Sequence, residues 1–409
     1  MSFIKMRWPA VTVAGVVLAV TAISPANAAT AALTCGATIT VDTTLHADLM
    51  NCPNLGIRIG ADDITLNLNG HTIAGNGVPF NCSPHQTCDV GVYNRGHDGV
   101  AIVGGTVRAF GVGIYDRAVR HNRLRGLSVP HNTDFGIRVE GATDSVIDRT
   151  SMSSSGIFGM LMIDSRHMLV SRDSVSGSHG YAIFLIRVDD SVFQNNSLHG
   201  NDHGIGGETI SRNIIRSNSV FRNGGSSIDF GNGSTGNRVE SNRLTDNGDG
   251  ILTNAYGTLI SHNIITGTGF FGFPDTGGFS LLIDGGEHIT VDGNIITGSR
   301  GPAIYVTSLD SPTASVNNVV SRNVVNSRLS DGILVDNGAT GTRLLRNVAI
   351  GSGDDGIDVD APATTLTGNI ANRNHDFGIE AVPGVTNGGG NHAAGNGNPA
   401  QCVNIICHR

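Results

Sequence analysis

The stretch Gly136-Ile137-Arg138-Val139-Glu140 is one copy of a short pattern that recurs along most of the chain. In each copy a small residue precedes an apolar one, and apolar and polar residues then alternate. This alternation is typical of a β-strand with one buried face, and its recurrence about every 23 residues indicates stacked repeats. The apolar residues that mark the copies are Ile114, Ile137, Met160, Ile183, Ile205, Ile228, Ile251, Leu282, Ile304, Ile333, Ile357 and Ile379.

A column of asparagines keeps the same intervals as the strand pattern. An asparagine in a tight turn bonds its own backbone, and at a spacing of ~4.8 Å its amide also reaches the amide of the next coil. We therefore predict a ladder of side-chain amides, with Asp148 and Asp173 taking the same place in earlier copies. The asparagines are Asn196, Asn218, Asn242, Asn263, Asn294, Asn323, Asn347 and Asn369.

The composition agrees with a turn-rich β-structure. The chain has 409 residues, of which 57 are glycine, about twice the usual share of about 7%. No apolar period of 3.6 residues appears after the first segment, so the chain is not a helical bundle. Short strands that recur once per coil predict an all-β fold, a single parallel β-helix of about 13 coils. We expect a monomer.

The first 28 residues resemble an export signal. Lys5 and Arg7 precede the apolar run 11–22, and Ala26-Asn27-Ala28 supplies small residues for cleavage. Removal of this segment takes away the chain's only lysine and lowers the formal net charge from −8 to −10. We therefore expect a secreted protein that has no membrane anchor after cleavage, and the acidic balance disfavours nucleic acid as a partner.

Six cysteines lie in pairs near the two ends of the chain. An even number in an exported protein predicts disulfides, and local pairing is favoured by the clustering, with metal binding as the alternative. A solenoid needs caps over its end coils. We therefore expect a signal peptide at 1–28, an N-terminal cap at 29–62, the β-helix at 63–386 and a C-terminal cap at 387–409. The cysteines are Cys35, Cys52, Cys82, Cys88, Cys402 and Cys407.

These repeats resemble the right-handed parallel β-helix proteins of the pectin-lyase-like fold, and among them a repeat family of carbohydrate-binding proteins and sugar hydrolases. The stretches 63–73 and 396–402 also look like features of secreted bacterial members. The resemblance implies a right-handed coil and a polysaccharide as the partner. The repeat marks are architectural, so they do not specify an activity.

Carboxylates gather in the last three copies of the pattern. Residues one and three places after each marked isoleucine should face solvent, and several acidic residues there should lie within ~5 to 10 Å of one another. Polygalacturonase-like hydrolases carry related acidic motifs, to which Ser330-Asp331-Gly332 and Gly353-Asp354-Asp355 are similar, although the Gly-His-Gly and Arg-Ile-Lys motifs are missing. The resemblance implies catalytic roles for Asp331, Asp354, Asp355 and His375. The outward Asp358 beside them completes the predicted catalytic set.

Two alternatives remain open for this acidic face. Clustered carboxylates suit Ca²⁺, which Asp336, Asp358 and Asp360 could bind. Lyases of this fold use Ca²⁺ with a basic residue, and without lysine that base would be an arginine such as Arg138 or Arg187. The other alternative is a polysaccharide-binding solenoid without catalysis, whose acidic face is simply solvated.

Two intervals between copies are long, 31 residues before Leu282 and 29 after Ile304, so their extra residues flank the same sheet. Insertions on one side of a solenoid often form its binding surface. We therefore expect a carbohydrate-active enzyme that cleaves a polysaccharide over this sheet, with hydrolase and lyase chemistry both open. The predicted substrate-binding residues are Phe270, Phe271, Phe273, Tyr305, Asp336 and Glu380.

Overall fold

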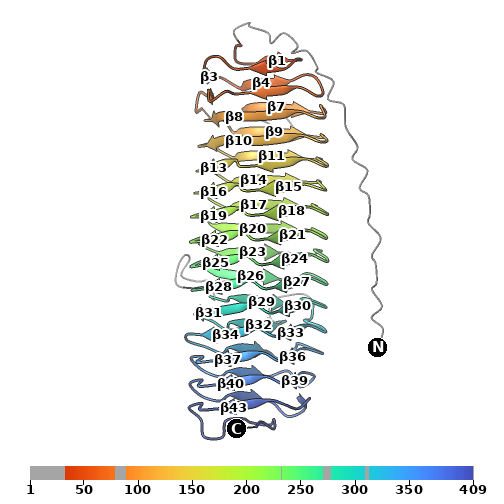
Figure 1. Cartoon of the computed structure of the whole chain (residues 1–409), viewed down its shortest axis with the longest axis vertical. Coiled ribbons are helices and arrows are strands. Elements are labelled where there is room, and N and C mark those ends of the chain that lie inside the picture. Colours follow the sequence, from red (N-terminus) through yellow and green to blue (C-terminus); the bar gives the residue numbers. More distant parts are fainter. Residues whose placement is uncertain (1–32, 79–88, 232, 270–277, 309–312, 409) are drawn as a thin grey trace, which may run out of the picture.

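The computed structural model describes residues 33–78, 89–231, 233–269, 278–308 and 313–408. These residues form a tall stack of β-coils that runs from the N-terminal to the C-terminal end of the molecule (Figure 1). Within these ranges there is no α-helix, and thus none long and apolar enough to cross a membrane. The predicted all-β parallel solenoid is confirmed.

The largest sheet, called here the long sheet, takes one strand from every coil. All its neighbouring strands are parallel, because each coil returns to the same side before it pairs again. Its fifteen strands are β1 (Ala37–Ile39), β4 (Leu55–Ile59), β7 (Val90–Arg95), β9 (Val112–Arg117), β11 (Phe135–Glu140), β14 (Phe158–Ile163), β17 (Tyr181–Ile186), β20 (His203–Glu208), β23 (Ser226–Phe230), β26 (Asp249–Thr253), β29 (Leu281–Asp284), β32 (Ile304–Thr307), β35 (Ile333–Val335), β38 (Ile357–Val359) and β41 (Ile379–Ala381).

Two further columns of strands complete the coils, and β8 (Ala101–Arg108) and β10 (Arg123–Pro130) are long enough to run through both. The second sheet also contains β2 (Thr43–Thr44), β5 (Thr65–Asn67), β12 (Val146–Asp148), β15 (Leu169–Ser171), β18 (Val192–Gln194), β21 (Ile214–Arg216), β24 (Arg238–Glu240), β27 (Leu259–Ser261), β30 (Thr290–Asp292), β33 (Val319–Ser321), β36 (Arg343–Leu345), β39 (Thr365–Thr367) and β42 (Thr386–Asn387). The third sheet also contains β3 (Leu49–Cys52), β6 (Thr72–Gly75), β13 (Ser151–Ser153), β16 (Ser174–Ser176), β19 (Ser197–His199), β22 (Ser219–Phe221), β25 (Arg243–Thr245), β28 (Ile264–Thr266), β31 (Ile295–Ser299), β34 (Val324–Ser327), β37 (Val348–Ile350), β40 (Ile370–Asn372) and β43 (His392–Ala394).

The stack has about two more coils than the 13 expected. The strand pattern marks twelve coils from Ile114 onward, whereas β1, β4 and β7 add three before it. Of these, β1 and β4 lie within residues 29–62, where a cap was expected. The pairs Gly56-Ile57 in β4 and Gly91-Val92 in β7 carry the same mark, but the 35 residues between Ile57 and Val92 interrupt the period of about 23. The regular part of the pattern therefore gives too low a count.

The marked apolar residues point into the core, with one exception. Ile137 and Ile357 are fully buried, while Asp358 beside Ile357 is only partly buried, as the alternation predicts. Leu282 was expected to point inward, but it pairs with the outward Leu252, and the buried residue is Leu281. Two leucines in succession hide the register, and Ser280 before Leu281 is the small residue that would have resolved it.

The asparagine ladder is confirmed. From Asn196 to Asn391, the Nδ2 atom of each rung donates to Oδ1 of the asparagine one coil on, at 3.0 to 3.1 Å. Asp173 takes the rung before Asn196, as predicted, because its backbone N–H donates to Asn196 Oδ1 at 2.9 Å. Asp148 does not hold the rung before Asp173. Thr150 holds it, because the backbone N–H of Thr150 donates to Asp173 Oδ1. The interval from Asp148 to Asp173 is two residues too long for one coil.

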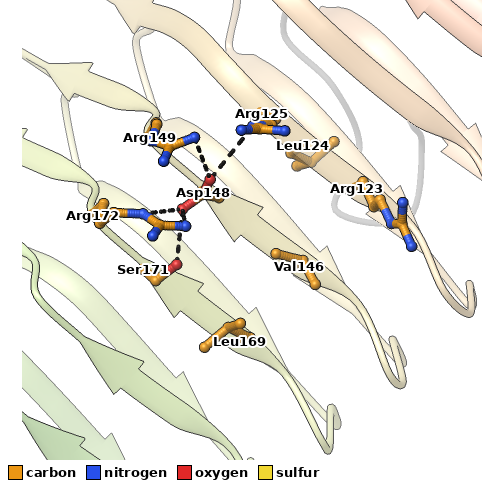
Figure 2. Close-up of a pocket in the computed structure, with 9 residues that line it drawn as sticks. All are labelled: Arg123, Leu124, Arg125, Val146, Asp148, Arg149, Leu169, Ser171 and Arg172. Atoms are coloured by element: carbon orange, nitrogen blue, oxygen red, sulfur yellow. Dashed lines mark hydrogen bonds and ion pairs between the residues drawn. The ribbon is translucent and has the colours of Figure 1, made fainter. Parts of the chain in front are cut away.

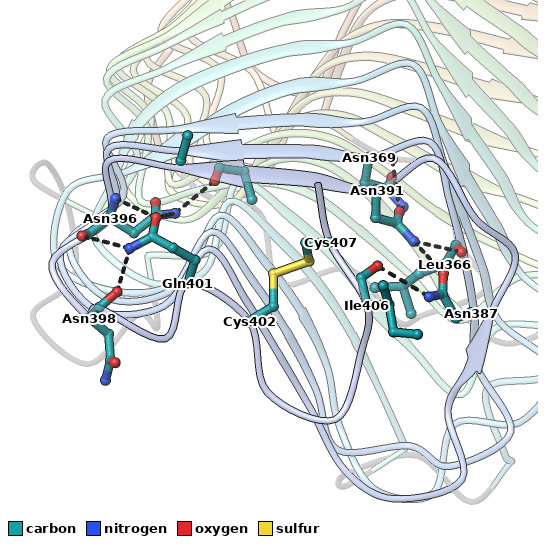
Figure 3. The surroundings of a disulfide bond; sticks show 12 residues. Leu366, Asn369, Asn387, Asn391, Asn396, Asn398, Gln401, Cys402, Ile406 and Cys407 are labelled. Atoms are coloured by element: carbon teal, nitrogen blue, oxygen red, sulfur yellow. Dashed lines mark hydrogen bonds between the residues drawn. A yellow bond between two sulfur atoms is a disulfide. The ribbon is translucent and has the colours of Figure 1, made fainter. Parts of the chain in front are cut away.

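Disulfides close both ends of the described chain. Cys35 pairs with Cys52 and Cys402 with Cys407, as expected from their spacing. Cys82 and Cys88 lie outside the described residues, as does the segment 1–28. Figure 3 shows how the last rungs of the ladder pass to cap residues: Asn391 Nδ2 donates to Asn387 Oδ1 at 3.0 Å, and Asn387 Nδ2 donates to the Ile406 carbonyl at 3.1 Å.

Candidate functional site

Five acidic side chains meet on the outer face of the long sheet near the C-terminal end of the stack. Asp331 precedes β35, Asp354 and Asp355 precede β38, and Asp358 and Glu380 lie within β38 and β41. Asp358 and Glu380 are direct neighbours in the parallel register of these two strands. We call these five residues the acid cluster.

The acid cluster consists of two overlapping groups. Carboxylate oxygens of Asp331, Asp354 and Asp355 lie within 4.8 Å of one another, and so do those of Asp355, Asp358 and Glu380. Asp355 belongs to both groups, so it connects the turn to the strand face. The coil spacing thus brings together residues up to 49 positions apart in the sequence.

Part of this arrangement is structural. Asp331 Oδ1 accepts the backbone N–H of Asp355 at 3.0 Å, and Asp355 Oδ1 accepts that of Phe377 at 2.6 Å. Asp249 Oδ1 accepts the N–H of Phe279 at 3.0 Å in the same way, outside the acid cluster. An aspartate two residues before the inward isoleucine therefore bonds the next coil, whether or not other acids surround it.

The environment favours the protonated form of three of the five acids. Burial raises the pKa of Asp331, and it raises the pKa of Asp355 to about 8, with a hydrogen bond to Glu380 and the charges of Asp331 and Asp354 adding to the effect. Burial also raises the pKa of Asp358 to about 7, and repulsion from neighbouring carboxylates adds to it. The site therefore holds carboxylic acids that keep a proton near neutral pH.

The other predicted acidic and histidine residues lie beside the acid cluster. Asp336 Oδ2 accepts the Tyr305 hydroxyl at 2.7 Å, and Asp360 is exposed after β38. Neither belongs to the two close acidic groups found in the described ranges. His375 is exposed in the turn before β41, and its backbone N–H donates to the Asp354 carbonyl at 3.0 Å. No hydrogen bond or ion pair joins its imidazole to another described residue.

Aromatic side chains lie on the same face, further up the stack. Tyr305 on β32 stands in the outward column that continues through Leu334 to Asp358, two coils away. Its ring centroid is 5.5 Å from that of Phe279, and both side chains are half-buried. At ~4.8 Å per coil Tyr305 lies ~10 Å from Asp358, and Phe279 is one coil further, within reach of one extended sugar chain. The predicted platform residues Phe270, Phe271 and Phe273 lie outside the described residues.

The arginines considered as lyase bases are held elsewhere. Arg138 lies on β11, where its guanidinium stacks on Tyr115 and bonds Glu140 Oε2 at 3.1 Å. Arg187 is paired with Asp164 at 2.5 Å. Neither belongs to the coils that carry the acid cluster, so these two arginines do not supply a base there.

A second polar group lies on the long sheet, among residues of β17, β20 and β23. The Tyr181 hydroxyl donates to Asp229 Oδ2 at 3.1 Å across two coils, over Gly206. His203 Nδ1 lies 3.1 Å from both the backbone N and the Oγ of Ser226. Burial raises the pKa of Asp229 and lowers that of His203. The strand pattern does not mark this contact, because Tyr181 is in register with His203 and reaches Asp229 diagonally over Gly206.

The acid cluster also has the chemistry of a cation site. Hard oxygen ligands from several carboxylates suit Ca²⁺, and the two close groups offer three each. They include Asp358 but not Asp336 or Asp360, the other residues expected to bind the ion. A bound cation would favour the ionised form of Asp355 and Asp358, and would remove the protons that they otherwise keep.

Comparisons with known proteins agree with this architecture. The family described as "Right handed beta helix region" matches residues 43–206, 110–270 and 250–406. No curated protein matches the sequence. Among solved structures, the periplasmic alginate epimerase AlgG is similar over 76% of this chain and 75% of its own, with 14% identity and a TM-score of 0.53.

Two other solved structures are similar at lower scores. The A-module of the mannuronan C-5 epimerase AlgE6 of Azotobacter vinelandii matches 82% of this chain and 88% of its own, with 12% identity and a TM-score of 0.48. DFA-IIIase from Arthrobacter chlorophenolicus A6 without its lid matches 75% and 83%, with 16% identity and a TM-score of 0.46. At these identities the similarity shows the fold alone. The chain belongs to the right-handed β-helix family.

Proposed function

We propose that the protein is an exported carbohydrate-active enzyme that hydrolyses a polysaccharide on the outer face of the long sheet. The observation that carries the proposal is the acid cluster. In it, Asp358, which keeps a proton near neutral pH, lies with other carboxylates whose oxygens are within 4.8 Å of its own. Glycoside hydrolysis requires such a pair: one carboxylic acid protonates the leaving oxygen, and a second carboxylate activates water or attacks carbon.

The contacts divide the acidic residues between these roles. Asp358 projects from β38 beside Glu380, and its pKa is about 7, so it is the proton donor. Glu380, its neighbour on β41, supplies the second carboxylate. Asp355 keeps its proton and forms a hydrogen bond with Glu380. The Phe377 backbone N–H, which donates to Asp355, holds the Asp355 side chain in place.

The neighbouring surface supports a sugar chain as the substrate. Half-buried aromatic rings stack on sugar rings, and Phe279 and Tyr305 lie in line with the acid cluster along the stack. The disulfides at both ends support export to an oxidising compartment. AlgG, which has a similar fold, is an alginate epimerase, so in that protein the fold carries polysaccharide chemistry.

The test is a panel of neutral and acidic polysaccharides incubated with the protein, read by reducing ends and by absorbance near 235 nm. We expect new reducing ends without that absorbance, unchanged by a calcium chelator. Asp358→Asn should abolish product formation, and Asp249→Asn, which keeps an oxygen for the Phe279 N–H, is the control that should not. Chelator-sensitive product absorbing near 235 nm would show a lyase, and binding to a glycan without any product would show a non-catalytic solenoid.

A further inference from the structure

A second charged hollow lies away from the long sheet, on the second sheet near the N-terminal part of the stack. It has a volume of about 330 Å³, and its charged lining consists of four arginines and one aspartate. Arg123 and Arg125 come from β10, Asp148 ends β12, and Arg149 and Arg172 stand in the turns after β12 and β15 (Figure 2). The hollow therefore carries a surplus of three positive charges on a chain whose net charge is −8.

Asp148 organises three of these arginines. Its carboxylate is almost fully buried and accepts the Arg172 guanidinium at 2.5 Å and the Ser171 hydroxyl at 2.9 Å. Arg125 and Arg149 lie 3.5 and 3.6 Å from its other oxygen, and Figure 2 shows them converging on it. One carboxylate cannot neutralise three guanidiniums, and the exposed Arg123 forms no ion pair with a described residue. Each of Arg125, Arg149 and Arg172 is at least half exposed, so donors remain for a ligand.

The same corner recurs further down the stack with a single arginine. Asp292 ends β30 and accepts the Ser321 hydroxyl and the Arg322 guanidinium, both at 2.6 Å, just as Asp148 accepts Ser171 and Arg172. In that corner Leu259, Ser261 and Gly293 take the places of Arg123, Arg125 and Arg149. One arginine therefore suffices to build the corner, and the other three are not needed for the fold.

The hollow continues round the corner onto the third sheet. A neighbouring depression of about 620 Å³ shares Arg149 and Arg172 with it and is otherwise lined by glycines, small hydroxyl residues and Leu127. Gly104 and Gly126 hold the turn positions that Arg149 and Arg172 hold in the next two coils, all with positive φ. A Cβ added at Gly126 would meet nothing within 4 Å, so the missing side chains leave the surface open.

From this geometry we infer a second carbohydrate site, separate from the acid cluster, which binds a carboxylated polysaccharide such as a polyuronate. Guanidinium groups bind carboxylates through paired N–H donors, and they are always charged. The arginines span three coils, about 10 Å, so they suit an extended chain with repeated carboxylates better than a single small anion. A neutral glycan would leave three positive charges uncompensated.

The inference is tested by fluorescence anisotropy with labelled hexagalacturonate, using the Asp355→Asn/Asp358→Asn variant as the parent so that no cleavage intervenes. Adding Arg123→Gln, Arg125→Gln and Arg149→Gln should weaken binding about tenfold or more, because three charge-assisted contacts are lost. Arg172 is kept, since it builds the corner. The single change Arg123→Glu breaks no ion pair with a described residue, and it should weaken binding in the same direction.

The matched control removes three exposed arginines from other coils, in the combination Arg216→Gln, Arg222→Gln and Arg243→Gln. It changes net charge by the same amount and should leave binding within about twofold. Unlabelled polygalacturonate should displace the probe, whereas a neutral cello-oligosaccharide or a poly-glutamate peptide of equal charge should not. The inference is overturned if the parent does not bind, if the control weakens binding as much as the triple change, or if the peptide competes equally. None of these outcomes depends on whether the acid cluster is catalytic.

Discussion

Replacing Asp173 by asparagine should stabilise the protein, and increasingly so as the pH rises. Asp173 holds a ladder rung with its side chain almost fully buried. Its Oδ1 accepts the Thr150 N–H at 2.7 Å, but its Oδ2 is buried without a partner in the described structure. An asparagine would place an N–H₂ group there, as Asn196 does, and would donate to the Ile147 carbonyl and to Asn196 Oδ1.

The magnitude follows from the ionisation of Asp173. Burial raises its pKa from 3.8 to about 7, and repulsion from Asp148 adds to this. At about 1.4 kcal/mol per pH unit the full cost of ionising it in place is about 4 kcal/mol, and we take about 2 kcal/mol because water entry and local relaxation relieve part of it. The folded state binds the proton more tightly, so wild-type stability falls as the pH rises from about 4 to about 7. The variant lacks this loss.

Scanning calorimetry at pH 4.5, 6 and 8 measures the effect. For a chain of this length, about 2 kcal/mol corresponds to a rise in melting temperature of about 2 to 3 °C, which should appear at pH 8 and largely vanish at pH 4.5. The reverse change one rung on, Asn196→Asp, should lower the melting temperature at pH 8. A lower melting temperature for Asp173→Asn at pH 8, or a difference that does not depend on pH, would refute the reasoning.

Three further predictions use the same contacts. Asn263→Ala should destabilise the protein by about 2 to 4 kcal/mol, because it removes the acceptor of the Asn242 N–H and the donor to the Val239 carbonyl. A loss of less than about 1 kcal/mol in the free energy of unfolding, measured by denaturation, would contradict a ladder role. Hydrolysis should decline with an apparent pKa near 7 as Asp358 loses its proton, and a pH–rate profile still rising at pH 9 would exclude it as the acid. Gly206→Ala should destabilise the chain by about 1 to 2 kcal/mol, since a Cβ there lies too close to the Tyr181 ring; an unchanged melting temperature would show that the ring moves freely.

The fold was predictable because its signal is periodic. Strands that recur about every 23 residues and asparagines that keep the same interval both require stacked coils. The structure has these stacked coils. Errors arose where the period was locally ambiguous. Leu281 and Leu282 offer two equally apolar choices, and Asp148 lies two residues from the ladder position that it was expected to fill.

The candidate site was predictable in its location and less so in its contacts. Outward acids on successive coils must be close, so the meeting of Asp358 and Glu380 followed from the spacing. Which acids lie within a few ångströms depends on side-chain directions in the turns, and the sequence pattern does not contain these. For this reason the sequence did not show that Asp336 accepts a hydrogen bond from Tyr305 and lies outside the two close groups. The contacts around Asp148 do not follow from the strand pattern either, because its arginines come from different strands and turns.

The decisive measurement for the proposed activity is mass spectrometry of products formed from a polysaccharide panel in water enriched in oxygen-18. Hydrolysis by the acid cluster predicts one heavy oxygen at each new reducing end, and no product from the Asp355→Asn/Asp358→Asn variant, whose melting temperature should not fall. Unlabelled unsaturated products, undiminished turnover by that variant, or no product from the wild-type protein on any member of the panel would contradict it.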